Sequence, residues 1–334
     1  SFPRRPPDTT SKPVTVTESP TPRFRISRHK RLAWWGSGLA CLLSVVGLLV
    51  SWLSPGIGAP LKPGLDFTGG TQIQLERQCV LSDCGSITVD QLQAGLAALT
   101  LPAKAKEQAP SLASAKVQLL DGGQTLLLRL PVLEADQSQA VIVGIDRLAG
   151  PLKTTGTSVN TIGPTLGSQL LQGSLVSLLV SFAAIALYIT FRYDRVFAFL
   201  AIVALAHDVI ITCGLFAWLG IFFGIEVDSL FAVSLITVAG YSVTDTVVVF
   251  DRIREQKKAL AQLPLIEQVD VAVDATLTRS LYTSLTTLLP LLGLIFFGGS
   301  SLFWFSVALA VGIAVGSWSS IGVAPTLLPV LSRR

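Results

Sequence analysis

The chain has 334 residues, of which 50% are hydrophobic and only 14% charged, with a formal net charge of +4. This composition excludes an intrinsically disordered protein and is far too apolar for an ordinary soluble enzyme. The basic residues lie in short clusters beside apolar stretches, which indicates signals for membrane topology rather than a nucleic-acid-binding surface.

Residues 1–31 are rich in Pro, Ser and Thr and end in a basic run, which predicts a disordered cytoplasmic tail with a juxtamembrane basic cluster. The apolar stretch that follows, 32–53, is too long for a signal-peptide core, and no small-x-small cleavage site follows it. We therefore predict that 32–53 is the first transmembrane helix and that its N-terminus is cytoplasmic.

Residues 54–168 have the pattern of a small α+β domain. Strands are predicted at 71–76, 116–120, 124–130 and 153–162, and helices at 88–99 and 134–148, with Thr88 as an N-cap. Asp121-Gly122-Gly123 is a hairpin signal between the two middle strands. The order β-α-β-β-α-β is that of a ferredoxin-like split βαβ domain. The glycines of LDFTGG indicate turns and close approach rather than a nucleotide-binding loop.

The remainder, 169–334, is predicted to hold membrane helices 2–6, at 170–191, 196–220, 228–250, 281–297 and 302–330. A charged segment, 251–279, separates the first three spans of this group from the last two. Every basic loop falls on one side of the membrane, so 54–168 is extracytoplasmic and both termini are cytoplasmic. The fold class is an α-helical membrane protein of six transmembrane helices with an inserted ferredoxin-like domain after the first.

Asp245 lies inside the fourth span, on the same helix face as Tyr241. A carboxylate in a membrane helix is costly and usually faces a bundle interior or a water path. It indicates proton or ion handling. The alternative is a carboxylate that only holds two helices together.

Two further polar sites lie in the predicted helices. His207 and Asp208 lie near the middle of the third span, either as part of the polar pathway or as a clamp to a neighbouring helix. Arg279 is predicted at the depth of Asp245, where it could pair with that carboxylate and favour its ionised form. The alternative for Arg279 is an interfacial residue that snorkels. Small residues in the last two helices indicate tight packing.

The four cysteines do not form one set, and no His partner has a metal-ligand spacing with them. Cys79 and Cys84 lie in a polar loop of the inserted domain. They form a disulfide if that loop is extracytoplasmic, and free thiols are the equal alternative.

Several motifs together resemble the SecF subunits of the SecD–SecF protein-export complex, of the resistance-nodulation-division (RND) transporter type. They are GLDFTGGTQIQLE at 64–76, IGPTLG at 162–167, AIVALAHD at 201–208, GYSVTDTVVVFDRIRE at 240–255 and TLTRSLYTSLTTLL at 276–289. The resemblance covers residues 32 to about 330, and the N-terminal tail lies outside it.

This resemblance implies a partnership with SecD, the SecYEG channel and YidC, in membrane lipid, and a pull on the emerging preprotein driven by the proton motive force. It places the proton relay at Asp245 and Arg279. The polar residues that we expect to support it in the membrane are His207, Asp208, Tyr241 and Thr244. The resemblance also makes Asp66, Gly69 and Gly70 family motif residues. Thr244 stands where the family usually has Asn, so either a tuned or an altered relay is expected.

The expected function is therefore that of a protein-export accessory subunit, without enzymatic activity, metal or bound cofactor, that uses the proton gradient as its energy source. The alternatives are a scaffold subunit that carries no protons and a subunit of an RND-type small-molecule exporter. The expected location is a bacterial inner (plasma) membrane, with a thylakoid membrane as the alternative. The residues alone allow H⁺ or Na⁺ as the coupling ion.

Overall fold

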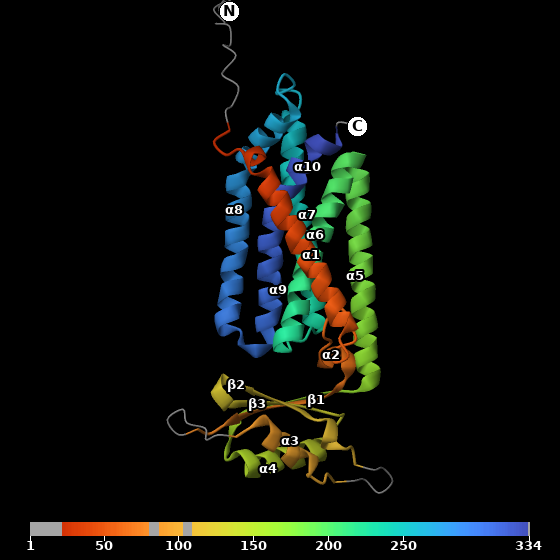
Figure 1. Ribbon diagram of the computed structural model, residues 1–334, viewed down its shortest axis with the longest axis vertical. Helices are drawn as coiled ribbons and strands as arrows, with labels where there is room; N and C mark the ends of the chain where they lie inside the picture. Colours follow the sequence, from red (N-terminus) through yellow and green to blue (C-terminus); the bar gives the residue numbers. More distant parts are fainter. Residues whose placement is uncertain (1–21, 80–86, 103–108, 333–334) are drawn as a thin grey trace, which may run out of the picture. The chain divides into compact units, whose positions relative to one another are not determined.

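The computed structural model describes residues 22–79, 87–102 and 109–332. Within that part of the chain, six helices are long and apolar enough to cross a membrane (Figure 1). They are α1 Lys30–Leu53, α5 Pro164–Arg192, α6 Arg195–Phe223, α7 Ser229–Gln256, α8 Leu265–Phe297 and a last span, Leu302–Leu331, built from α9 Gly299–Trp318, η4 Ser319–Val323 and α10 Ala324–Leu331. The predicted number and order of membrane helices are confirmed.

The helical part differs from expectation in the charged segment 251–279. Helix α7 continues to Gln256, and α8 begins at Leu265, well before the predicted apolar span. The reason is packing: Val269, Ala272 and Val273 are buried although they lie outside the long apolar run. Helix α5 also begins earlier than predicted, at Pro164, which is a favourable first residue of a helix.

The small sheet domain contains α2 Leu65–Thr68, β1 Gly70–Arg77, α3 Val89–Ala97, η2 Leu112–Ser114, β2 Lys116–Leu120, η3 Asp121–Gly123, β3 Thr125–Leu130, α4 Ala135–Ala149 and β4 Leu152–Ile162. Its four strands are antiparallel, in the order β2-β3-β1-β4. The predicted strands, helices and hairpin are confirmed, and Thr88 caps α3 in a capping box with Gln91.

One face of this sheet carries the core of the domain. Ile73 and Leu75 of β1 are fully buried, as are Leu126 and Leu128 of β3, because alternate residues of a strand point to the same face. They form one cluster with buried side chains of α3 and α4, which lie against the same face of the sheet (Figure 1).

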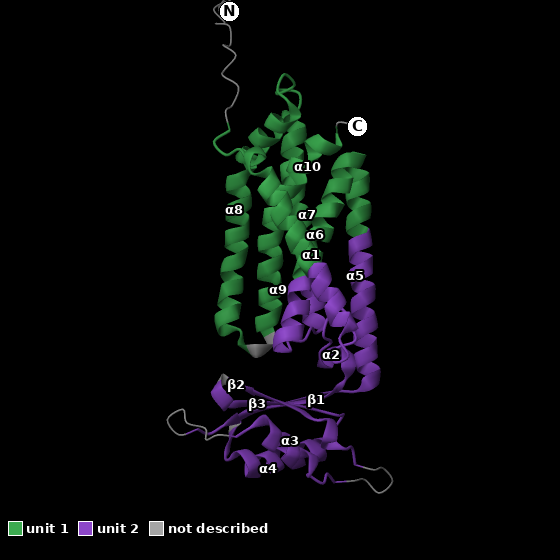
Figure 2. Ribbon diagram, viewed as in Figure 1, with its two compact units in different colours: residues 1–43, 184–212, 237–334 green, residues 44–183, 213–236 purple. Residues whose placement is uncertain are grey.

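The chain divides into two compact units, residues 1–43, 184–212 and 237–334, and residues 44–183 and 213–236 (Figure 2). The second unit contains the sheet domain, and the first contains the buried polar side chains described next.

The paired glycines before β1 have the conformational role that the motif predicted. Gly69 and Gly70 have φ values of 70° and 125°, which favour glycine. A Cβ on Gly70 would lie 2.9 Å from the carbonyl oxygen of Leu130, so the backbone approaches β3 too closely for a side chain.

Candidate functional site

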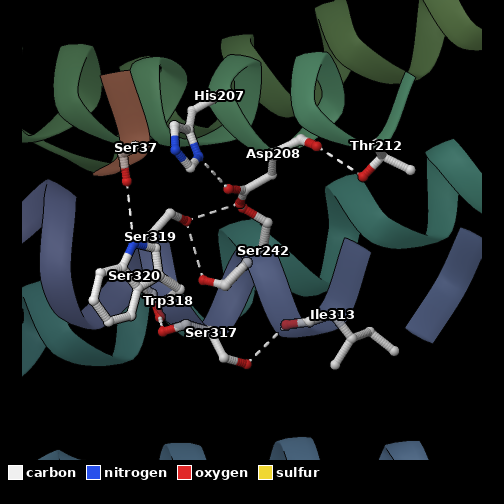
Figure 3. Close-up of polar contacts among 11 residues, drawn as sticks. Ser37, His207, Asp208, Thr212, Ser242, Ile313, Ser317, Trp318, Ser319 and Ser320 are labelled. Atoms are coloured by element: carbon white, nitrogen blue, oxygen red, sulfur yellow. Dashed lines mark hydrogen bonds and ion pairs between the residues drawn. The ribbon is translucent and has the colours of Figure 1, made fainter. Parts of the chain in front are cut away.

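A buried carboxylate, Asp208, joins three separate segments of the first unit (Figure 3). Asp208 of α6 is 0% exposed. Its Oδ2 atom accepts hydrogen bonds from Ser242 Oγ of α7 at 2.5 Å and from Ser319 Oγ of η4 at 2.9 Å. The buried carboxylate therefore has hydroxyl donors from two other elements.

His207 forms a pair with this carboxylate. Its Nδ1 atom lies 2.8 Å from Asp208 Oδ1, and the side chain is only 8% exposed (Figure 3). The other ring nitrogen, Nε2, is buried and has no hydrogen-bond partner within the part of the chain that the structure describes. An ionised carboxylate can only accept, so the geometry favours the tautomer with the proton on Nδ1.

A second buried carboxylate, Asp245 of α7, is 7% exposed. It accepts hydrogen bonds from Ser280 Oγ of α8 at 2.8 Å and from Ser320 Oγ of η4. Among the described side chains, no cation lies within ion-pair distance of it. Asp245 thus links α7, α8 and η4 through hydroxyl groups alone.

The last membrane span changes its winding where it meets both carboxylates. Five residues, Ser319–Val323, form a π-helical turn between α9 and α10. Consecutive serines at the start of this turn donate to different carboxylates, Ser319 to Asp208 and Ser320 to Asp245. Single π turns inside α-helices occur frequently at functional sites. Here the turn connects the two carboxylates through neighbouring residues of one backbone.

Close packing of α9 brings its serines to these positions. A Cβ on Gly312 would clash with Val238 Cγ2 of α7, so this glycine allows α9 to approach α7, as expected for small residues in membrane helices. One turn later, a Cβ on Gly316 would have an ordinary contact distance of 3.4 Å from Asp208 Oδ2.

The structure places Arg279 at the depth of Asp245 but does not bring the two side chains together. Its neighbour Ser280 donates to Asp245, whereas Arg279 itself is exposed. The proposed ion pair is therefore not present in this conformation among the described residues, and the pairing stays a prediction. The physical reason is helical periodicity, because adjacent residues of α8 point in directions about 100° apart.

Tyr241 and Thr244 have partners other than Asp245. The Tyr241 hydroxyl lies 2.8 Å from Ser284 Oγ of α8, and that oxygen lies 2.5 Å from Ser317 Oγ of α9. Thr244 is exposed, and its hydroxyl donates to the carbonyl of Gly240 in its own helix. Tyr241 thus extends the polar contacts between α7, α8 and α9, while Thr244 faces away from them.

The motif residue Asp66 belongs to the second unit. Its hydrogen-bond partner is Ser229 rather than one of the buried serines of the first unit. It accepts hydrogen bonds from both the backbone N–H, at 3.1 Å, and the hydroxyl of Ser229 at the start of α7. Burial raises the pKa of the nearby Asp228 carboxyl above its usual value, the Phe231 N–H opposes that shift, and the charge of Asp66 adds to it. Asp66, like Gly69 and Gly70, has a structural role here.

Cys79 is disulfide-bonded, whereas Cys84 lies outside the described residues, so the predicted pair stays a prediction. Over the described ranges, no group of three or more His, Cys, Asp or Glu side chains could hold a metal ion.

Sequence reasoning identified the carboxylates but missed their donors. Ser280, Ser319 and Ser320 are among the small residues of the last two helices, for which the sequence predicts only tight packing, and no sequence pattern marks Ser242. Depth in the membrane is the signal that could identify these donors. A hydroxyl at the same level of the membrane as a buried carboxylate is a candidate partner, because an unpaired carboxylate there is costly.

The fold and these contacts define a multi-pass membrane protein with a small antiparallel sheet domain and two buried carboxylates linked by serines. The family model "Protein export membrane protein SecD/SecF, C-terminal" matches residues 147–334, and the model "SecD/SecF GG Motif" matches residues 57–79. The chain belongs to the SecD/SecF family of protein-export membrane proteins, and its relatives identify it with the SecF members of that family.

The relatives match over nearly their whole length. The chain is 53% identical to the protein translocase subunit SecF of Prochlorococcus marinus over 305 residues, 91% of this chain and 94% of the relative. It is 39% identical to the same subunit of Synechocystis over 307 residues, 91% of this chain and 93% of the relative.

A solved structure supports the fold over most of the chain. The crystal structure of SecDF from Thermus thermophilus, described as a translocon-associated membrane protein, matches with a TM-score of 0.74 and 31% identity. The match covers 94% of this chain and 39% of that SecDF chain. The predicted family resemblance is confirmed.

Proposed function

We propose that this chain is an accessory subunit of Sec-dependent protein export that, together with SecD, uses the proton motive force to promote late steps of preprotein translocation. The SecF names of its relatives support the export role. The observation that carries the coupling is Asp245, a buried membrane carboxylate whose described donors are hydroxyl groups from two other elements.

Hydroxyl partners suit a carboxylate that exchanges a proton. A serine can donate to the ionised carboxylate and accept from the protonated acid, whereas a guanidinium can only donate. Asp245 can therefore change its protonation state without leaving Ser280 or Ser320 without a partner. Arg279, at the same depth, would pair with Asp245 in a second conformation and favour the ionised form there. Alternation between the two arrangements would couple protonation to movement of α7 and α8.

The coupling is tested by preprotein export in cells whose only SecF is this chain, compared with its Asp245→Asn variant at matched membrane abundance and SecD retention. Loss of most export is expected, because Asn cannot exchange a proton. Asp251→Asn is the control, since Asp251 is on the same helix but binds the Tyr193 hydroxyl instead. Normal export by Asp245→Asn would favour the scaffold alternative. Repeating the assay with a Na⁺ gradient in place of a proton gradient distinguishes the coupling ion.

An uncovered face of two helices supports SecD as partner. Thr237, Gly240 and Thr244 share one exposed face of α7, and Arg279 and Thr283 are exposed on α8. An arginine exposed to lipid at membrane depth is costly, and a face of glycine and threonine allows a neighbouring helix to approach closely. We infer that SecD helices cover this face. The fusion of both subunits in the SecDF relative of Thermus thermophilus agrees with that inference.

A photoreactive amino acid at position 283 tests this contact in membranes that contain both subunits. It is expected to cross-link to SecD, whereas the same group at Leu179, an exposed residue of α5, is expected to react mainly with lipid. Equal SecD cross-linking from both positions, or none from 283, would contradict the assignment of this face.

The remaining parts of the proposal concern location and the sheet domain. The basic residues of the loops favour a bacterial inner membrane with both termini cytoplasmic and the sheet domain outside. Its element order and its β2-β3-β1-β4 sheet support a ferredoxin-like class. On the outer side it could contact the emerging preprotein, SecYEG or YidC. An RND-type small-molecule exporter is the rival, and copurification of this chain with Sec components would separate the two.

A further inference from the structure

We propose that His207 and Asp208 form a second proton-binding site, at His207 Nε2, and that the Ser319–Ser320 turn links its proton affinity to the charge of Asp245. This inference rests on the proposed function, in which Asp245 exchanges a proton, and extends it to a second group.

The first observation is the unpartnered nitrogen. Nδ1 of His207 lies 2.8 Å from Asp208 Oδ1, while Nε2 is buried with no hydrogen-bond partner among the described residues. Buried polar atoms are nearly always paired, so a group that only clamped two helices would be expected to use both nitrogens. With the proton on Nδ1, the Nε2 lone pair is free to accept a proton from solvent hydronium, which leaves water, and the ring then changes from neutral to a charge of +1.

The second observation is that the site already holds the countercharge that an imidazolium needs. Asp208 is fully buried, and its Oδ2 atom accepts hydrogen bonds from the hydroxyls of Ser242 and Ser319. A protonated His207 beside it would form a neutral pair, and burying a neutral pair costs less than burying an isolated carboxylate. Proton uptake at Nε2 therefore reduces the net charge buried between α6, α7 and η4 (Figure 3).

The third observation is the link to Asp245. Ser319 donates to Asp208 and the next residue, Ser320, donates to Asp245, within one π turn. Among the described residues, the titratable groups that interact with Asp208 are His207 and Cys41 of α1, and its contacts from α7 and η4 are hydroxyls. Asp245 is connected to the pair through the Ser319–Ser320 turn, and its charge is the one that changes in the proposed cycle.

The chain offers a direct measurement, because it contains only two histidines, His29 and His207. The full chain is labelled with ¹⁵N-histidine and placed in lipid nanodiscs. It carries a tag without histidine, and the exposed His29 is replaced by Gln. The ring ¹⁵N shifts of His207 are followed against pH, and a His207→Gln sample confirms the assignment. The expected result is a neutral Nδ1–H tautomer at high pH that gains a proton at Nε2 in one step as the pH falls.

Three variants test the linkage. Asp245→Asn removes a nearby negative charge and is expected to shift the His207 midpoint to lower pH by roughly one unit. Asp208→Asn removes the adjacent charge and is expected to cause a larger shift in the same direction. Thr212→Val is the matched control, because that buried hydroxyl donates only to the backbone carbonyl of Asp208, and its midpoint is expected to stay unchanged.

A His207 that does not titrate between about pH 5 and pH 9 would overturn the site, and the pair would then be a structural clamp. A midpoint unchanged by Asp245→Asn would overturn the linkage. These outcomes are independent of export: if Asp245→Asn exports normally while His207 titrates, the proposed function fails and the site stands. If His207 does not titrate while Asp245→Asn abolishes export, the inference fails and the proposed function stands.

Discussion

At the scale of single residues, both buried carboxylates of the membrane helices accept hydrogen bonds from serine hydroxyls. Asp208 accepts from Ser242 and Ser319, and Asp245 accepts from Ser280 and Ser320. A buried carboxylate paired with arginine would be held in one charge state, because the cation favours ionisation strongly. A hydroxyl can donate to an ionised carboxylate and accept from a protonated acid, so these partners fit either form.

A carboxylate outside the spans provides a pH test of local energetics. Asp228 precedes α7, and burial raises its pKa above the usual value. Since the folded state then holds the proton more tightly than the unfolded chain, the stability from Asp228 is complete below its unfolded-state pKa and is lost as the pH rises through its folded-state pKa.

Asp228→Asn is therefore expected to raise the thermal unfolding midpoint of the full chain at about pH 7.5 and to leave it unchanged near pH 3.5. Asn retains the acceptor for the Phe231 N–H, so the helix cap is kept. A variant that is less stable than the wild type at the higher pH would contradict this account of Asp228.

At the scale of elements, the close approach of α9 to α7 determines whether the serines of η4 reach the carboxylates. Gly312 leaves no room for a Cβ beside Val238, whereas Gly316 has ordinary contact distances. The two glycines therefore provide a matched pair on one helix.

Gly312→Ala is expected to destabilise the chain by about 1–3 kcal/mol through overpacking, and Gly316→Ala by much less. The measurement is unfolding in detergent. Adding Val238→Ala to Gly312→Ala removes the clashing methyl groups, so partial recovery of stability is expected relative to Gly312→Ala alone. Equal loss at both glycines, or no recovery, would show that the α7–α9 contact is not the cause.

The start of α8 also binds the segment that precedes α1, a contact that the composition of α8 does not predict. Asp270 accepts from the backbone N–H and the hydroxyl of Ser27, at 2.9 and 2.6 Å. One turn later, Asp274 accepts from the N–H groups of Arg23 and Phe24, at 3.1 and 2.9 Å. These bonds hold the segment before α1 against α8, with Ile26 buried.

Asp270→Ala removes both bonds to Ser27 and is expected to speed tryptic cleavage after Arg25 and Arg28 roughly thirtyfold, since each lost bond contributes about 1 kcal/mol. Ser27→Ala removes only the hydroxyl bond and should give a smaller increase. Glu267→Ala is the control, because Glu267 lies about one turn before Asp270 in α8 and has no described bond to this segment. Unchanged cleavage in Asp270→Ala would contradict the role of these bonds.

At the scale of the whole molecule, the second unit ties its sheet domain to the connection between α6 and α7. Pro63 and Val227 form a parallel β-bridge, and Gly64 N–H donates to the Val227 carbonyl at 2.7 Å. Glu226 lies 3.3 Å from Lys62 Nζ and also pairs with Arg129 of β3. One carboxylate thus joins the segment that enters the domain, a strand of its sheet and the connection between α6 and α7.

Glu226→Gln is expected to increase the hydrogen-exchange rate of the Gly64 and Val227 amides about fivefold, because a partly buried pair contributes on the order of 1 kcal/mol. The effect should shrink at high salt. Glu76→Gln, which breaks the more exposed Glu76–Lys153 pair inside the domain, is the control and should leave both amides unchanged. Equal rates in wild type and Glu226→Gln would show that the backbone bridge alone holds this junction.

Much of the architecture follows from the sequence by itself, because its causes are local. Long apolar runs determine the six spans, alternation and turn residues determine the order of strands and helices in the sheet domain, and a carboxylate inside an apolar run is visible as Asp208 or Asp245 without a structure. Only the tertiary structure decided which hydroxyl meets which carboxylate, and that Arg279 faces away while Ser280 faces inward. Those contacts join residues of α6, α7, α8 and η4 that are far apart in sequence. They depend on the rotation of each helix about its axis and on one π turn, neither of which any local pattern specifies.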